Sequence, residues 1–222
     1  MDVACYKPAA QLTGKQQNLW NEFEAIFPTE LDLISAAIAL GAGAIKPWAE
    51  AEIELARNTY RTAPLNKTKL AYLRELICLD PLGEAFCALR APAERRESGA
   101  TYTPSPIVRS MVEWAADRGT PQRIIDPGVG SARFLLQAAE RFLQASLIGI
   151  DIDPLATLIA RANLTVAGFA KRSRVILGDY RNFNEPVTAR TLYIGNPPYV
   201  RHHQIATKWK DWFSAEATKL AN

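Results

Sequence analysis

Side chains suited to disulfides and metal sites are scarce in this sequence of 222 residues. It contains three cysteines and two histidines, and no two cysteines form a CxxC pair. An odd cysteine count without that spacing argues against a disulfide framework and against a structural zinc site. His202 and His203 are adjacent and have no third candidate ligand nearby, so no metal is expected. The cysteine usage predicts a reduced protein in the cytoplasm.

Long apolar runs and a strong excess of one charge are also missing. No apolar run approaches the roughly 20 residues that span a bilayer, and the N-terminus lacks the basic and then apolar pattern of a signal peptide. We therefore expect no membrane partner. The net charge of +3 is below that of many nucleic-acid binders, so any nucleic-acid surface is expected to be local. With 48% apolar and 22% charged residues, the composition is that of a globular protein.

Hydrophobic patterns divide the chain near the charged segment Pro92–Gly99. Before it, apolar residues recur at helical spacing. This predicts a helical N-terminal region over residues 1–95, with helices near 16–27, 31–40, 48–60 and 69–79. After it, strand and helix patterns alternate, which predicts an α/β domain over residues 96–222 with a parallel sheet and right-handed crossovers.

The strands expected in this sheet cover residues 123–126, 147–151, 174–177 and 191–194. Ser105 and Asp153 are each followed by proline, which predicts an N-cap with proline at the first helical position. The two helices should run to about residues 118 and 166, and a third should cover residues 132–145.

A short glycine loop follows the first expected strand. Gly128 and Gly130 would let the backbone approach a ligand closely, and the helix after them offers free N–H groups. Asp151 ends the second strand, where a carboxylate can accept both hydroxyls of a ribose. An ordinary tight turn is the alternative. The acidic Asp126 would repel a pyrophosphate and suits a cationic ligand with an ammonium group, such as S-adenosylmethionine.

The segment Asn196-Pro197-Pro198-Tyr199 follows the fourth strand and points to the chemistry. Its prolines lock the backbone and remove two N–H donors, so the Pro197 carbonyl and the Asn196 side-chain oxygen become fixed acceptors. An amino group on an aromatic ring is a poor nucleophile because its lone pair is delocalised. Two acceptors that grip its hydrogens localise that lone pair and stabilise the positive charge that grows on nitrogen. Tyr199 offers a flat face for a base flipped out of duplex DNA.

These motifs together resemble a known family. The segments 126–134, 149–154, 178–180 and 196–199 resemble the ordered motifs of amino-group methyltransferases. Gly99-Ala100-Thr101-Tyr102-Thr103-Pro104 resembles the motif that gamma-class DNA adenine-N6 methyltransferases of restriction–modification systems place ahead of the glycine loop. The resemblance implies a Rossmann-like class I methyltransferase core, S-adenosyl-L-methionine as cofactor, and double-stranded DNA with a flipped adenine as substrate. A cognate restriction endonuclease is the other partner that it implies.

The resemblance also assigns roles to single residues. It places the methionine end of the cofactor against Thr103 and its ammonium against Asp126, beside the loop of Gly128 and Gly130. The ribose falls to Asp151, and the cofactor's adenine to Ile152, Asp179 and Tyr180, with Pro197 close by. The catalytic motif comprises Asn196, Pro197, Pro198 and Tyr199: the first two grip the target amine, and Tyr199 stacks on the flipped adenine.

Two departures from the family pattern bear on these expectations. Ala132 stands where the family commonly has glycine, so the loop is expected to be slightly crowded there without loss of binding. The sequence stops about twenty residues after Tyr199. We expect the later strands of the sheet and the target-recognition domain to be absent from it, and Leu192 and Ile194 to lie on an unpaired edge.

Other chemistries compete with this interpretation. Cytosine-C5 methylation needs a cysteine nucleophile, but Cys5, Cys78 and Cys87 all precede the glycine loop. A protein-glutamine methyltransferase acting on release factors would share the helical N-terminal region and the asparagine-proline-proline-tyrosine motif. The threonine-proline segment favours DNA. The cations and aromatics after Tyr199 fit either a contact with DNA or an amphipathic helix with a solvated basic face. A non-catalytic, cofactor-binding fragment is the third alternative.

Overall fold

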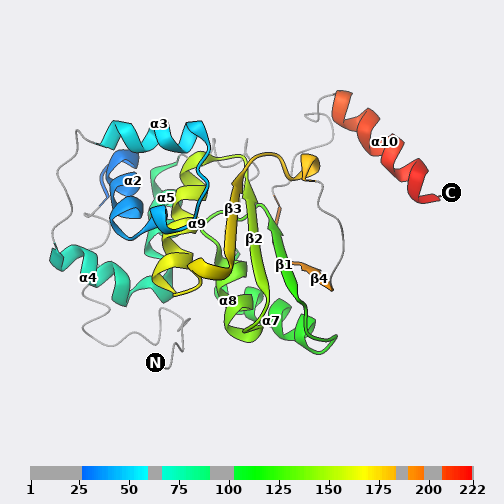
Figure 1. The fold of residues 1–222 in the computed structure, drawn as a ribbon, viewed down its shortest axis with the longest axis horizontal. Coiled ribbons are helices and arrows are strands. Elements are labelled where there is room, and N and C mark those ends of the chain that lie inside the picture. The colour runs from blue at the N-terminus through cyan, green and yellow to red at the C-terminus, as the bar shows by residue number, and fades with distance from the viewer. Residues whose placement is uncertain (1–26, 60–66, 91–102, 184–189, 198–206, 222) are drawn as a thin grey trace.

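The computed structural model describes residues 27–59, 67–90, 103–183, 190–197 and 207–221 (Figure 1). At its centre is a four-stranded sheet with the order β3-β2-β1-β4, in which every pairing is parallel. The strands are β1 (Arg123–Pro127), β2 (Ser146–Asp151), β3 (Ser173–Leu177) and β4 (Thr191–Tyr193). The expected parallel α/β sheet is confirmed, and each strand lies within one residue of its predicted bounds.

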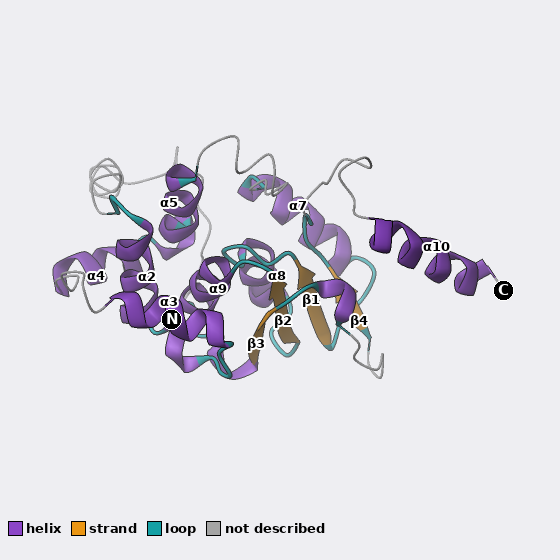
Figure 2. Ribbon diagram, turned by 90° about the horizontal axis from the view of Figure 1, so that it is seen from above, coloured by secondary structure: helices purple, strands orange, loops and turns teal. Residues whose placement is uncertain are grey.

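Three helices cover one face of this sheet: α7 (Ser105–Ala116), α8 (Arg133–Arg141) and α9 (Pro154–Val166). The view from above shows them along the same side of the strands (Figure 2). Because side chains alternate along a strand, Ile124 and Leu147 pack in the core beneath these helices, whereas Ile125 and Ile148 pack in a smaller cluster. The helices α8 and α9 provide the β1-to-β2 and β2-to-β3 connections, so both follow the carboxyl end of a strand.

The predicted helix starts are partly confirmed. Asp153 caps α9, and its side chain accepts hydrogen bonds from the backbone of Leu155 and Ala156. The assignment of Ser105 as an N-cap is wrong, because Pro104 occupies that position and Ser105 is the first helical residue. The Ser105 hydroxyl instead accepts a hydrogen bond of 3.0 Å from Nε2 of Gln137 in α8, which joins the two helices.

The N-terminal region is helical, as predicted. Helices α2 (Glu30–Ala39), α3 (Glu50–Asn58) and α4 (Lys67–Glu75) match the predicted segments, whereas α5 (Pro81–Leu89) was not predicted. The predicted helix at 16–27 lies outside the described residues except at Phe27. Short 3-10 turns occupy Ala42–Ala44, Ile77–Leu79, Ala170–Arg172 and Tyr180–Asn182.

The N-terminal helices pack against α9, on the side of that helix away from the sheet. Leu33 of α2 and Leu82 of α5 share one buried cluster with Leu158 and Ile159 of α9. The expected boundary at residues 95 and 96 lies outside the described residues, so the division there remains a prediction. The shared cluster shows that the described N-terminal helices and the α/β core are joined by apolar packing on a common helix.

A buried ion pair fixes this packing. Nε of Arg161 in α9 lies 2.8 Å from Oε1 of Glu52 in α3, and both side chains are almost completely buried. The same guanidinium donates to the carbonyl oxygens of Ile45, Pro47 and Val175. Because one guanidinium binds groups from α3, from the segment before α3 and from β3, Arg161 holds all three against one point on α9.

The strand β4 forms one side of the sheet. Within the described part of the chain it pairs with β1 alone, as expected for an edge. However, Ile194 is buried and Leu192 half-buried against the α7 core, and it is Tyr193 that is 58% exposed.

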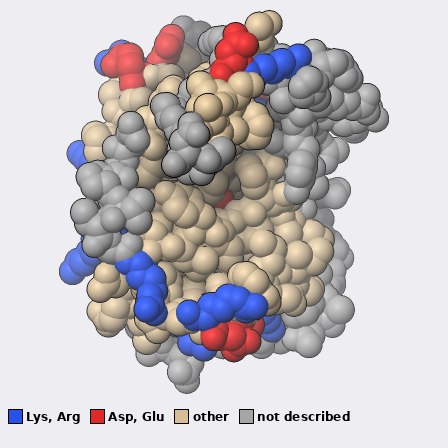
Figure 3. Space-filling view, turned by 90° about the vertical axis from the view of Figure 1, so that its right-hand side faces the viewer, with Lys and Arg blue, Asp and Glu red and all other residues tan. Residues whose placement is uncertain are grey.

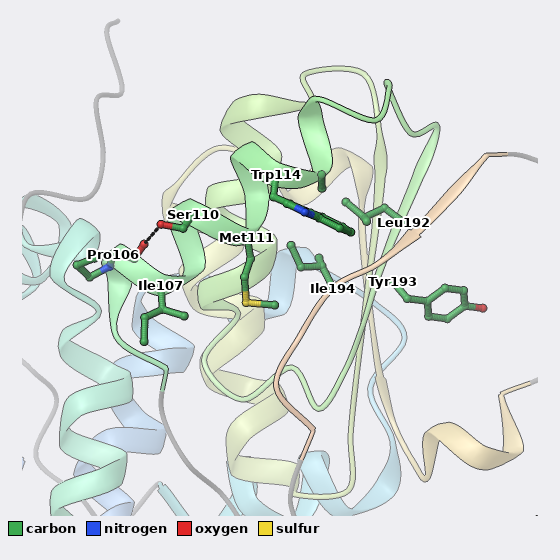
Figure 4. Close-up of a pocket in the computed structure, with 9 residues that line it drawn as sticks. Pro106, Ile107, Ser110, Met111, Trp114, Leu192, Tyr193 and Ile194 are labelled. Atoms are coloured by element: carbon green, nitrogen blue, oxygen red, sulfur yellow. Dashed lines mark hydrogen bonds between the residues drawn. The ribbon is translucent and has the colours of Figure 1, made fainter.

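An apolar groove of about 610 Å³ lies between α7 and β4 (Figure 4). Its lining residues are Pro106, Ile107, Ser110, Met111, Trp114, Ala115, Leu192, Tyr193 and Ile194.

The face of the molecule beside this edge carries few described charges near its centre, and most of those visible lie toward its upper and lower margins (Figure 3). The last helix, α10 (Thr207–Ala221), extends away from the sheet (Figure 1). No helix among the described residues is both long and apolar enough to cross a membrane.

We predict that Glu52→Ala destabilises the fold by about 3–5 kcal/mol, because it leaves the buried Arg161 charge without its partner. The chain offers a matched control on the same helix: Glu50 pairs with Arg57, but both side chains are largely exposed. Glu50→Ala should therefore change the free energy of unfolding by less than about 1 kcal/mol. Urea denaturation measures both, and equal losses for the two variants would contradict this account.

Candidate active site

The carboxyl ends of the parallel strands gather most of the predicted site residues. Asp126 lies at the end of β1 and Asp151 at the end of the adjacent β2. The chain leaving β4 passes beside Asp126: a Cβ at Gly195 would lie 2.2 Å from Oδ1 of that aspartate, so only glycine fits. Asn196 follows directly. The sheet thus brings together the acidic residues and the start of the proline motif, at the edge where open α/β sheets bind ligands.

The glycine loop is shaped by positive backbone angles. Gly128 has φ of 137° and Gly130 of 50°, which side chains adopt only at a cost. The amides of Gly128 and Val129 both donate to the carbonyl of Ile150 in β2, each at 2.9 Å. The loop is therefore fastened across the strand ends, as a close approach to a ligand requires.

Ala132 ends this loop in a left-handed conformation, with φ of 73° and ψ of 25°. A residue other than glycine pays roughly 1–2 kcal/mol there. The sequence predicted a steric departure from the family pattern at this position. In the structure the departure is one of backbone conformation. The Ala132 methyl packs in the core beneath the helices, but the backbone φ angle is one that favours glycine.

Asp126 is the most unusual group of the site. Its side chain is buried, and neither carboxylate oxygen has a hydrogen-bond partner among the described residues. Burial, reinforced by the nearby charge of Asp151, raises the pKa of Asp126 well above its usual range. An ionised carboxylate in this position needs a positive charge that the described residues do not supply.

Asp151 is better satisfied. Its Oδ2 accepts a hydrogen bond of 2.9 Å from the Gly130 amide, and its Oδ1 accepts one of 3.0 Å from the Asp153 amide. Burial raises the pKa of Asp151, and these backbone donors oppose the rise. A carboxylate oxygen has two lone pairs, so each can accept one further hydrogen bond from a ligand hydroxyl.

The residues expected around an adenine ring differ in their availability. Ile152 is 69% exposed and Tyr180 is 46% exposed, so both present apolar surface beside the strand ends. Asp179, by contrast, is held by Arg181, whose Nε lies 2.8 Å from Oδ1 and whose Nη2 lies 2.5 Å from Oδ2. The guanidinium also lies 3.5 Å from the ring centre of Trp209 in α10. The role of Asp179 toward an adenine amine remains a prediction, and Arg181 would have to release one of the Asp179 oxygens before that oxygen could accept from the amine.

The proline motif is joined to the threonine-proline segment. Nδ2 of Asn196 donates a hydrogen bond of 3.1 Å to Oγ1 of Thr103, although 93 positions separate the two residues. Because the amide nitrogen is engaged, the carboxamide oxygen Oδ1 points elsewhere and remains an acceptor for a ligand. Pro197 is half-buried beside it. Pro198 and Tyr199 lie outside the described residues, so their predicted roles are not tested.

Sequence reasoning missed Asp80, although its pattern offered a recognisable signal. Asp80 is followed by Pro81, the same cap-then-proline pattern that located α9, and it caps α5. Its contacts with Ser131 and Arg133 beside the glycine loop had no sequence signal, because about fifty positions separate the partners.

Comparison with known proteins places this arrangement in a family. The sequence profile described as N-6 DNA Methylase matches residues 80–221. Type II methyltransferase M.XamI of Xanthomonas campestris pv. amaranthicola is 49% identical over 140 residues, which cover 63% of this chain and 25% of that protein.

Two further relatives have other named substrates. A tRNA1(Val) (adenine(37)-N6)-methyltransferase of Porphyromonas gingivalis (strain ATCC BAA-308 / W83) is 34% identical and covers 40% of this chain and 37% of its own length. A release factor glutamine methyltransferase of Vibrio cholerae serotype O1 is 26% identical and covers 63% of this chain and 51% of its own length. The chain thus spans between a quarter and about half of these curated relatives. Since the family profile covers well over half of the chain, the protein belongs to the N-6 DNA methylase family.

Proposed function

We propose that this chain carries the cofactor-binding and catalytic part of an S-adenosylmethionine-dependent DNA adenine-N6 methyltransferase. The observation that carries the proposal is the approach of three groups at one sheet edge. The Asp126 carboxylate, which has no hydrogen-bond partner in the described part of the chain, lies against Gly195, and the next residue, Asn196, has its amide nitrogen anchored to Thr103. The Asp126 carboxylate suits a cationic ligand, and the Asn196 carboxamide, which Thr103 anchors, presents a fixed acceptor to an amine.

The described residues fit S-adenosylmethionine on physical grounds. Among the described residues the buried Asp126 has no cation beside it, and the ammonium group of this cofactor would supply one. Asp151 retains lone pairs for the ribose hydroxyls, and the exposed Ile152 and Tyr180 offer apolar surface for an adenine. When bound, the cofactor would supply an electrophilic methyl group, and its sulfur would keep the electron pair of the carbon–sulfur bond that breaks.

Asn196 and Pro197 would activate the target nitrogen. The amine's two N–H groups donate to Oδ1 of Asn196 and to the carbonyl of Pro197, which favours a pyramidal nitrogen with a localised lone pair. The same acceptors stabilise the positive charge on nitrogen as its new bond to carbon forms, and a proton then leaves the nitrogen to solvent. Thr103 supports this role, because its hydroxyl keeps the carboxamide from rotating.

Adenine in DNA is the substrate that the family membership and the site favour. The family profile and the similarity to M.XamI support DNA, while relatives named for tRNA and for release factors define the alternatives. The segment that contains Thr103 resembles a motif of DNA adenine-N6 methyltransferases, and in this structure Thr103 contacts Asn196 directly. A flipped adenine stacked on Tyr199, a cytoplasmic location and a cognate restriction endonuclease are parts of the same proposal.

We predict that Asn196→Ala slows single-turnover methyl transfer by about 100- to 1000-fold, the effect of removing one fixed stabilising group from a transition state. Cofactor affinity should stay within a few-fold, because the substitution spares Asp126 and Asp151. The assay uses radiolabelled cofactor with unmethylated plasmid DNA, and tRNA and release factor serve as competing acceptors. Near-normal methyl transfer by the variant would contradict the catalytic role of Asn196. Preferential labelling of tRNA or protein would contradict DNA as the substrate.

Asp126→Asn should stabilise the ligand-free protein while weakening cofactor binding. A raised pKa in the folded state means that the folded protein loses stability as pH rises from the ordinary carboxyl value toward the raised one. The variant escapes this loss, so its advantage over the wild type should grow with pH over that range. Urea denaturation across pH, with calorimetry for S-adenosylmethionine, checks both effects. A variant that is less stable at neutral pH, or that binds the cofactor normally, would refute the role of Asp126.

A further inference from the structure

Helix α5 contacts both cofactor motifs, one at each of its ends. Its N-cap, Asp80, is completely buried and has φ of 53°, an unusual backbone angle for aspartate. One carboxylate oxygen accepts hydrogen bonds from the Gly83 amide at 3.0 Å and from Nδ2 of Asn163 in α9 at 2.9 Å. This part of the contact ties α5 to α9.

The other oxygen of Asp80 reaches the glycine loop. It accepts a hydrogen bond from the Ser131 hydroxyl and lies 2.6 Å from Nε of Arg133. Arg133 also pairs with Glu84 on the first turn of α5. The two residues on either side of Ala132 are therefore held by one helix from the N-terminal region.

The opposite end of α5 meets the second motif. Arg90, which follows the helix, pairs with Asp153, and its guanidinium lies 4.4 Å from the ring centre of Phe86 in α5. Asp153 caps α9, and its amide donates to Oδ1 of Asp151. The turn that carries the ribose-binding candidate is thus fastened to the same helix as the glycine loop.

The contacts at Asp80 have a specific physical task. Ala132 occupies a left-handed conformation that an isolated alanine avoids, and such strain persists only where neighbouring contacts over-determine it. Ser131 and Arg133 supply those contacts through Asp80. The backbone amide of Gly130, which precedes Ser131 in the loop, donates a hydrogen bond to the Asp151 carboxylate. A change at Asp80 is therefore transmitted along the loop to the acidic residue at the end of β2.

We propose that α5 braces the cofactor site, with Asp80 as a positioning residue that holds the glycine loop around the strained Ala132 and Arg90 as its counterpart at the Asp151 turn. The proposal rests on the proposed cofactor site and assigns a task to the N-terminal region, which the sequence left without one. Asp80 touches no ligand in this account and acts through Ser131 and Arg133.

The test compares Asp80→Asn in two backgrounds, wild type and Ala132→Gly. In the wild type the substitution should weaken S-adenosylmethionine binding by about ten-fold, which corresponds to the loss of roughly one hydrogen bond to a charged group. Ala132→Gly removes the strain, so the same substitution should cost at most about two-fold in that background. A residue that merely stabilises the fold would give equal losses in both backgrounds.

Controls separate the brace from general stability and from the function itself. Thr29→Ala removes the N-cap of α2, which makes no hydrogen bond or ion pair with the glycine loop among the described residues. It should lower the melting temperature and change cofactor affinity equally in the two Ala132 backgrounds. Should Asp80→Asn fail to fold, Arg90→Gln tests the other end of the helix, and Arg90→Lys should restore part of the affinity through its retained charge. Equal losses in the two Ala132 backgrounds would overturn the proposal for Asp80.

Hydrogen exchange supplies a readout that needs no ligand. In the ligand-free protein, Asp80→Asn should speed amide exchange at Gly130 and Ser131 in the wild-type background, whereas Thr29→Ala should not. Unchanged exchange at these amides would overturn the brace. A wild-type protein that shows the expected exchange pattern but binds no S-adenosylmethionine would leave the brace standing and would overturn the proposed function instead.

Discussion

The buried carboxylate of Asp126 and the half-buried one of Asp151 lie at the ends of adjacent strands, and the rest of the site is arranged around this costly pairing. Burial raises the pKa of both carboxyls, and a nearby like charge adds to the rise in each case, that of Asp151 at Asp126 and that of Asp153 at Asp151. Backbone amides compensate Asp151 in part, through Gly130 and Asp153. Asp126 receives no such help from the described residues, so its ionisation is unfavourable in the ligand-free protein, and a cationic ligand would relieve this cost.

Holding such a site in shape requires support from outside the sheet, and α9 is the element that transmits it. One side of α9 packs under the sheet, and the other carries the N-terminal helices through the Glu52–Arg161 ion pair and the contacts of Asp80. These groups are buried and mutually satisfied, which makes their geometry costly to change. The N-terminal helices therefore support the proposed cofactor site, although none of their residues was a candidate for binding the cofactor.

Local patterns were enough to predict the sheet. Apolar runs such as Leu147–Ile150 and the cap at Asp153 located strands and helices closely, because their signals lie within a few residues of each other. The glycine loop and Asn196 were likewise identified from adjacent residues, since each motif is short and its chemistry is carried by consecutive side chains.

Contacts across long sequence separations could not be predicted in this way. The link between Thr103 and Asn196 and the cluster around Asp80 both depend on how the chain folds back on itself. The left-handed angle at Ala132 was hidden for a different reason: alanine gives no sign of an unusual backbone, and a glycine there would have done so. The Asp80-Pro81 cap was visible in the sequence and was overlooked.

The most direct test of the central claim is the proton balance of cofactor binding. Calorimetric titration of S-adenosylmethionine into the protein, repeated in buffers of different ionisation enthalpy, measures the protons exchanged. Below the raised pKa of Asp126, the account predicts release of up to about one proton, as the arriving ammonium drives that carboxyl to ionise. Asp126→Asn should abolish this release. Binding by the wild type with no more proton release than the variant shows would contradict the claim that Asp126 receives the cofactor's positive charge.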